Sequence, residues 1–475
     1  MTRKVLLSPL FLLVGLLVAL IPIEGLSYQA HALMGLLTAT VLFWLFEIAP
    51  LGVVALGASA LAVILGIADA KTVFKEFANP LIFLFLGSFL IAAAFSKYGI
   101  DRYLAIKVLK NPAVRRNELL FIAAVLFIPW FLSMWLSNTA TTAMLLPIVA
   151  GLLSVIYPNG EWAENRLKFL LLGIAYASSI GGIATPVGTP PNIIALGFLQ
   201  KAGINISFGE WMALALPISL VSFAILVFVV KLLVGTVGVE KIDTRKLEEP
   251  KLGFVHKTVA AIFGGVILLW LLPSILGVLK EFVPAFGGIY KAVKAHLNYG
   301  AVAVLGAVLL FVIPKDPQKP SETILEIEDL KKIDWDTILL FGGGLALGSL
   351  MFKTGLVKFF GHKLATVMPH SEFWVIAILT AVAIFLTEFS SNTATANVLV
   401  PVVIGLAHTL GVDTFKAVFA TTLACSYAFM FPMATPPNAI VFGFTKMRVY
   451  EMARVGIILN LLGIIVISLM VYFSL

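Results

Sequence analysis

Two short strings of small polar residues recur in this chain, each inside an otherwise apolar stretch. Residues 133–142 read SMWLSNTATT and residues 387–396 read TEFSSNTATA, so Ser-Asn-Thr-Ala-Thr starts at 137 and again at 391. Hydroxyl and side-chain amide oxygens are ligands for hard cations. Asn amides and Thr hydroxyls can also donate hydrogen bonds to a carboxylate or sulfate. The strings therefore predict binding of a cation and of an anion.

A second repeated string follows each of these. Thr-Pro-Pro-Asn occupies 189–192 and again 435–438. Proline lacks a backbone N–H and cannot continue a helix, so each string predicts a helix break whose freed carbonyls need partners inside a membrane. A cation is one such partner. The oxygen donors predicted by this pattern are Ser137 and Asn138, Ser391 and Asn392, and the carbonyls near the small residues Gly188 and Ala434.

Long apolar runs identify the elements that must position these strings. The 475 residues are 60% hydrophobic and 12% charged, and runs such as 5–23 and 259–279 are long enough to cross a bilayer as helices. We therefore predict an all-α polytopic protein in the plasma (inner) membrane, with a cytoplasmic N-terminus. The net charge of +8 fits lysines and arginines at cytoplasmic membrane edges, so nucleic acid is not an expected partner.

The two halves of the chain repeat the same order of segments. Residues 83–100 align with 339–356, and each half carries one polar string and one proline break. We count about eleven membrane crossings and two re-entrant hairpins, which gives the two repeats opposite orientations. Inverted repeats with paired broken segments are typical of secondary transporters, whose site lies near the middle of the bilayer.

Other activities find no support in the sequence. The glycine-rich string at 342–348, GGGLALG, lacks the lysine of a phosphate-binding loop, and the six histidines have no metal-ligand spacing. The single cysteine, Cys425, excludes an intramolecular disulfide. We see no nucleophile–base constellation and predict that the chain is not an enzyme. A channel would not need duplicated, proline-broken sites.

Two polar features also admit a structural explanation. Ser, Thr and Asn in membrane helices often only bond neighbouring helices, although two matched strings, each followed by a break, favour a binding site. Glu388, just before the second string, aligns with Met134 and is not duplicated. It could brace the hairpin or carry a proton, and we favour bracing.

The strings resemble those of the divalent anion/sodium symporters, a family of sodium-coupled dicarboxylate, citrate and sulfate carriers. The resemblance covers essentially the whole chain and rests on 45–56, 132–148, 386–401 and 425–441. It implies a homodimer in the lipid bilayer, with a scaffold and a mobile, elevator-type transport domain in each protomer. The expected parts are N-terminal scaffold helices 1–67; a first repeat 68–236 with hairpin 118–156 and broken helix 168–200; a cytoplasmic connector 237–257; scaffold helices and a linker 258–336; and a second repeat 337–475 with hairpin 371–410 and broken helix 416–445.

The resemblance also implies roles for residues of the strings. One sodium site is expected from Ser133, Ser137, Asn138 and the Gly188 carbonyl, and the other from Thr387, Ser391, Asn392 and the Ala434 carbonyl. Contacts to a dianionic substrate are expected from Asn138, Thr139, Thr189, Asn392, Thr393 and Thr435. The implied function is import of a C4 dicarboxylate (succinate, malate or fumarate) with co-transported sodium ions. The alternatives are a sodium-independent dicarboxylate exchanger of the same fold and, less favoured, a sulfate or citrate carrier.

Overall fold

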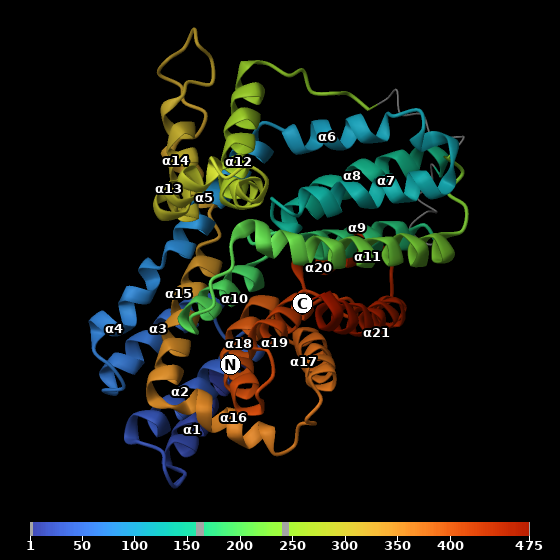
Figure 1. Cartoon of the computed structure of the whole chain (residues 1–475). Helices are drawn as coiled ribbons and strands as arrows, with labels where there is room; N and C mark the ends of the chain where they lie inside the picture. Colours follow the sequence, from blue (N-terminus) through green and yellow to red (C-terminus); the bar gives the residue numbers. More distant parts are fainter. Residues whose placement is uncertain (1–2, 158–165, 240–246, 475) are drawn as a thin grey trace.

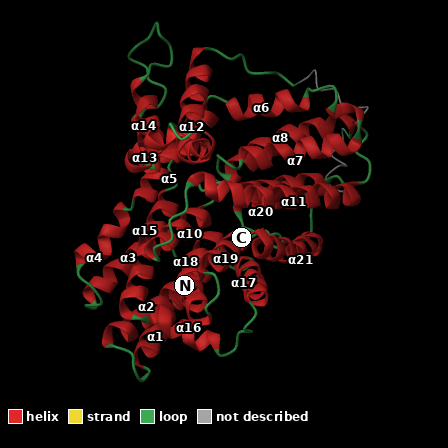
Figure 2. Ribbon diagram, viewed as in Figure 1, coloured by secondary structure: helices red, strands yellow, loops and turns green. Residues whose placement is uncertain are grey.

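The computed structural model describes residues 3–157, 166–239 and 247–474, and within them the chain is helical without any β-strand (Figures 1 and 2). The helices of the first half are α1 (Arg3–Leu20), α2 (Tyr28–Leu45), α3 (Leu51–Ile64), α4 (Ala70–Phe74), the 3₁₀ turn η1 (Lys75–Ala78), α5 (Pro80–Lys97), α6 (Ile100–Leu109), η2 (Val114–Arg116), α7 (Glu118–Leu132), α8 (Asn138–Ile156), α9 (Lys168–Gly182), α10 (Pro190–Lys201) and α11 (Phe208–Val234). Those of the second half are α12 (Phe254–Phe282), α13 (Phe286–His296), α14 (Tyr299–Val312), η6 (Ile327–Lys332), α15 (Trp335–Thr354), α16 (Leu356–Ala365), α17 (Glu372–Thr387), α18 (Asn392–Leu410), α19 (Thr414–Ala424), α20 (Pro436–Phe444) and α21 (Val449–Ser474). The all-α fold is as predicted.

Many of these helices are suited to a bilayer. Among the described residues, seven helical stretches are long and apolar enough to cross a membrane, or eight if the bent pair α13 and α14 counts as one span. Shorter apolar helices, including α7, α8, α9 and α17, accompany them. The chain is a multi-pass membrane protein, whereas the total of eleven crossings stays a prediction.

Each polar string forms the tip of a helical hairpin. The first hairpin joins α7 to α8 through residues 133–137, and the second joins α17 to α18 through residues 388–391. In Figure 1 the first hairpin lies above the layer formed by α9 and α11, and the second lies below it. The two tips approach this layer from opposite sides. Their inverted orientation in a membrane remains a prediction.

Each proline string separates two short helices. α9 ends at Gly182 and α10 begins at Pro190, while α19 ends at Ala424 and α20 begins at Pro436. Proline stands at the start of both downstream helices, where a backbone N–H would have no partner within the helix. The breaks therefore fall where the sequence predicts them.

The aligned segments of the two halves also fold alike. Gly99, at φ 65°, separates α5 from α6, and Gly355, at φ 83°, separates α15 from α16. Both junctions need a left-handed backbone, which glycine adopts without strain. Hydropathy did not predict α6, α13 and α16, because their apolar runs are too short to span a bilayer.

Two groups of helices can be distinguished by their packing. The framework group contains α1–α3, α5, α12, α14 and α15: α15 packs along α3, and α5 packs along α14. The hairpin group contains α7–α11 and α17–α21: the two hairpins and two broken helices pack on one another and on α11 and α21. The site lies between the two groups.

The linkers between these helices are partly anchored by ion pairs. Asp329, in η6, accepts hydrogen bonds from Lys97 at 2.7 Å and Lys332 at 2.8 Å. Burial alone would raise the pKa of Asp329, but the hydrogen bonds from these two lysines and from a backbone N–H bring it down to about 2.

In the predicted connector 237–257, residues 240–246 lie outside the described part of the chain.

Candidate functional site

A cavity of about 550 Å³ lies where the two tips and the two breaks meet. Four helices begin at residues that line it: α8 at Asn138, α10 at Pro190, α18 at Asn392 and α20 at Pro436. The unpaired N–H groups and the dipole at a helix N-terminus favour an anion. Of the described residues that line this cavity, none is a lysine or an arginine. An anion here would be held by backbone and side-chain dipoles.

The structure brings the predicted site residues together. Ten of the twelve line the cavity: Ser137, Asn138, Thr139, Gly188, Thr189, Ser391, Asn392, Thr393, Ala434 and Thr435. The other two, Ser133 and Thr387, are fully buried. Each donates its hydroxyl to the Oδ1 atom of the asparagine five residues later in its own hairpin. From the side that faces away from the cavity, these two hydroxyls orient the Asn138 and Asn392 side chains.

The oxygen atoms around the first tip converge next to Gly182. A Cβ atom built on Gly182 would lie 2.8 Å from Asn138 Oδ1 and 3.1 Å from the Gly188 carbonyl oxygen. A Cβ atom built on Gly188 would lie 2.4 Å from the Gly182 carbonyl oxygen and 3.0 Å from that of Met134. A side chain at either glycine would fill this space. Oxygen atoms gathered around so small a space suit a hard cation.

The second tip crowds oxygen atoms in a different way. Thr387 Oγ1 lies 2.7 Å from Asn392 Oδ1 and 2.8 Å from the Cys425 carbonyl oxygen. The Thr387 hydroxyl has only one proton, so it can donate fully to only one of these two acceptors. A cation bound between the three oxygen atoms would relieve the repulsion between their partial negative charges. At the positions of Gly182 and Gly188, the second repeat has Ala428 and Ala434, as aligned on Thr-Pro-Pro-Asn.

The last asparagine of each Thr-Pro-Pro-Asn string holds its break in shape. Asn192 Nδ2 and Asn438 Nδ2 donate to backbone carbonyls ten and seven residues earlier. The acceptors are Gly182 and Thr185 for Asn192, and Ala428 and Phe431 for Asn438, at 2.7–3.1 Å. The two breaks are therefore tied by the same hydrogen bonds. The repetition of this asparagine is a sequence signal for its role, although it was not among the predicted site residues.

Glu388 braces the second break. Its fully buried carboxylate accepts four hydrogen bonds, from the N–H groups of Phe429 (2.6 Å), Met430 (2.8 Å) and Phe431 (3.3 Å) and from Asn460 Nδ2 (2.7 Å). Hydrogen bonds from backbone N–H groups stabilise a buried carboxylate. This geometry supports the bracing role and gives no role in binding to Glu388, which does not line the cavity.

A buried hydroxyl of α9 connects the first repeat to the second break. Tyr176, buried on α9, donates to the Phe429 carbonyl oxygen at 2.5 Å, and the two ring centroids are 4.8 Å apart. Phe429 also donates its N–H to Glu388. The first broken helix and the second break are thus parts of one hydrogen-bonded unit.

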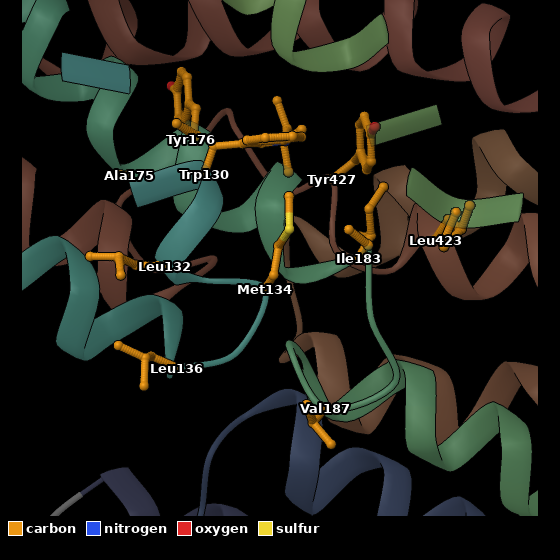
Figure 3. Close-up of a cluster of buried hydrophobic side chains, with 14 of the residues drawn as sticks. Trp130, Leu132, Met134, Leu136, Ala175, Tyr176, Ile183, Val187, Leu423 and Tyr427 are labelled. Carbon is orange, nitrogen blue, oxygen red and sulfur yellow. The ribbon is translucent and has the colours of Figure 1, made fainter. Parts of the chain in front are cut away.

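The first break rests on a hydrophobic base. Figure 3 shows Met134 extending from the tip toward Trp130 and Ile183, with Val187 on the opposite side of the break. Two side chains of α11 take up carbonyls near the break: Trp211 Nε1 donates to Ile183 at 3.1 Å, and Ser219 Oγ donates to Ile180 at 2.6 Å. These two hydrogen bonds pair carbonyls beside the break, as backbone groups inside a membrane require.

Three carboxylates also line the cavity, those of Glu47, Asp334 and Asp336. Asp334 accepts a hydrogen bond from the N–H of Thr337 at 3.0 Å, and Asp336 accepts one from that of Gly52 at 2.8 Å. Both therefore stabilise helix N-termini. Their negative charges oppose the entry of an anion and favour that of cations, so an anion would enter this cavity most readily together with cations.

Comparison with known proteins finds relatives of this chain among membrane transporters. A family model described as the sodium:sulfate symporter transmembrane region matches residues 3–474. An uncharacterized transporter of Haemophilus influenzae is 34% identical, over 94% of this chain and 92% of that protein. The sodium-dependent dicarboxylate transporter SdcS of Staphylococcus saprophyticus is 31% identical, over 91% of this chain and 83% of that protein. The protein of the same name from Staphylococcus aureus USA300 is 31% identical with the same coverage.

A solved structure shows a similar fold. The YdaH transporter of Alcanivorax borkumensis superimposes with a TM-score of 0.59, covering 91% of this chain and 97% of that one. The sequence identity is 13%. At this level the likeness concerns the fold alone.

Proposed function

This chain belongs to the sodium:sulfate symporter family, and we propose that it imports a C4 dicarboxylate such as succinate, malate or fumarate together with sodium ions. It is a membrane transporter rather than an enzyme. The observation that carries the proposal is the cavity in which four helix N-termini meet two oxygen-rich tips. Two relatives named sodium-dependent dicarboxylate transporters support the choice of substrate and ion.

The proposed substrate contacts follow the arrangement of the tips. One carboxylate of the dianion binds Asn138 and Thr139, and the other binds Asn392 and Thr393. Thr189 and Thr435, the residues that precede the prolines, lie on the same cavity and complete the contacts. A dicarboxylate has an anionic group at each end, which suits two facing tips that both offer N–H and O–H donors.

The proposed sodium sites are the two oxygen clusters. The first uses Ser133, Ser137, Asn138 and the Gly188 carbonyl, and the second uses Thr387, Ser391, Asn392 and the Ala434 carbonyl. Asn138 and Asn392 belong to both the substrate site and a sodium site, so cation binding orients the amide that donates to the substrate. The charge of each cation also offsets that of the dianion, and this couples the two species.

The proposed movement is of elevator type. The hairpin group carries the cavity contacts and moves as a body along the framework group, exposing the site first on one side of the membrane and then on the other. Each protomer of a homodimer would complete this movement by itself, since one chain supplies both tips and both breaks.

The test is uptake of labelled succinate by the purified protein in liposomes, with and without an inward sodium gradient. We expect uptake into empty vesicles that depends on the gradient. Uptake that is indifferent to sodium contradicts the proposal, and uptake only into vesicles preloaded with dicarboxylate supports exchange instead. Competition by unlabelled sulfate and citrate, each at the same concentration as unlabelled succinate, then ranks the substrate classes.

A further inference from the structure

A buried ion pair lies at the far end of α10, away from the substrate contacts. Lys201, the last residue of α10, places its ammonium 2.8 Å from Glu76 Oε2 in η1 and 2.8 Å from the Leu345 carbonyl oxygen in α15. It also donates to the Ser349 hydroxyl, which in turn donates to Glu76 Oε1 at 2.8 Å. The three N–H bonds of the ammonium therefore have three acceptors. The side chains of Lys201 and Glu76 are only 19% and 9% exposed.

This ion pair joins the two groups of helices. Lys201 belongs to the hairpin group, because α10 packs on α18 and α19 and begins at the first break. Leu345 and Ser349 belong to α15, which packs along α3 in the framework group, and Glu76 lies in η1 beside α15. The contact thus crosses the boundary along which the proposed movement takes place.

The same boundary is lined by the glycine-rich string at 342–348. A Cβ atom on Gly348 would lie 2.1 Å from the Phe198 ring of α10, and one on Gly344 would lie 1.8 Å from Asn397 Oδ1 of α18. Glycine at these positions lets α15 touch two helices of the hairpin group at close range. Leu345 of α15 in turn lies against Gly197 of α10, at 3.0 Å from the position of a Cβ atom built there, so the close contacts between these two helices are apolar. Lys201 adds a charged, directional contact to this boundary.

A second buried ion pair provides a contrast. Lys168 Nζ of α9 lies 2.7 Å from Glu451 Oε1 of α21, with both side chains at most 20% exposed. Both residues lie in the hairpin group, so movement of this group would leave the pair intact. Movement of α10 along α15 would break the Lys201 contacts, and a buried charge without its partner is costly.

We infer that Lys201 is a positioning residue that latches the hairpin group to the framework group in the conformation described here. The latch rests on the proposed function, because it presumes that the two groups move relative to each other. Its ligands are the Glu76 carboxylate, the Leu345 carbonyl and the Ser349 hydroxyl. Its release is part of the step that exposes the site to the other side of the membrane.

Distances between two spin labels test this inference. The labels are attached to cysteines introduced at Ala202, beside the latch, and at Lys71 on α4; both positions are exposed, and the native Cys425 is buried and stays unlabelled. Pulsed electron resonance in lipid nanodiscs without substrate gives the populations of the distances. We expect Lys201→Met and Glu76→Gln each to lower the ratio of the latched to the released population by at least about tenfold.

Matched variants separate a latch from a simple structural pair. Lys168→Met removes a similar buried ammonium and is expected to leave the distance distribution unchanged. Lys201→Arg keeps the charge and should restore most of the latched population. Distributions identical to wild type in both Lys201→Met and Glu76→Gln would overturn the inference, even if sodium-driven uptake is intact. Loss of sodium-driven uptake in wild type, with the distances still shifting, would overturn the proposed function and leave the latch.

Discussion

The first and second breaks share their hydrogen bonds but not the helix that precedes them. Aligned on Thr-Pro-Pro-Asn, the last residue of α19, Ala424, corresponds to Ser178, yet α9 continues from Ser178 to Gly182. The second helix therefore unwinds about one turn earlier than the first. The N–H groups of residues 429–431, which this unwinding leaves without partners in the helix, donate hydrogen bonds to Glu388. The first repeat has a shorter break, and Met134 stands at the position that matches Glu388.

This difference shows that one binding geometry can be supported in two ways. The first copy brings its oxygen atoms together with two glycines, whereas the second has alanines there and uses a buried carboxylate to shape a longer break. Two repeats within one chain can thus keep matching tips while the residues that support the tips diverge. Each repeat can therefore be tested by its own variants.

The largest effect is expected at the two tip asparagines. Asn138→Ala and Asn392→Ala each remove an amide that we propose serves both a cation and the dianion, so each should lower sodium-driven succinate uptake by more than about a hundredfold. The control is Asn205→Ala, an exposed residue away from the tips. Wild-type uptake in either tip variant would show that the two copies are not functionally equivalent.

The next effect concerns the stability of the second break. Glu388→Gln is nearly isosteric but weakens the four charge-assisted hydrogen bonds, so we expect the free energy of unfolding to fall by about 3 kcal/mol. Met134→Leu, at the matching position, should cost less than about 1.5 kcal/mol. Denaturant-induced unfolding in detergent micelles measures both. Equal losses of unfolding free energy in the two variants would contradict the bracing role of Glu388.

A smaller effect is expected where the copies differ between glycine and alanine. Gly182→Ala adds a Cβ atom 2.8 Å from Asn138 Oδ1, which should raise the sodium concentration for half-maximal uptake by about tenfold. Ala428→Gly only adds space in the second copy and should change it by less than about twofold. The sodium dependence of initial uptake rates measures both. An unchanged sodium dependence in Gly182→Ala contradicts the first cation site.

The smallest effect is expected from a conservative change at Thr387, whose hydroxyl lies behind the second tip. Thr387→Ser keeps the hydroxyl that contacts Asn392 and Cys425 and removes only a buried methyl group, so uptake should change by less than about threefold. Thr387→Ala removes the hydroxyl and should reduce sodium affinity by about tenfold. If the serine variant loses as much as the alanine variant, packing rather than the hydroxyl decides the second site.

Much of the site could be predicted from sequence because it is built from strings that occur twice. The polar tips and proline breaks are local signals, and duplication places them opposite each other. The supporting residues are different. Gly182 becomes recognisable only when the chain folds back on itself, since its neighbours depend on how the break is closed. Lys201 is another such case, because its acceptors lie in helices far away in the sequence.

The hydrogen bond from Tyr176 to the Phe429 carbonyl has a thermodynamic consequence. It ties the helix that leads into the first proposed cation site to the segment that shapes the second, so ordering one site would lower the entropy that the other must lose. We therefore expect the two proposed sites to fill cooperatively, so that sodium activation of transport rises more steeply than a hyperbola, with a Hill coefficient above one. Tyr176→Phe keeps the ring contact and removes this hydrogen bond, and we expect the Hill coefficient to fall toward one.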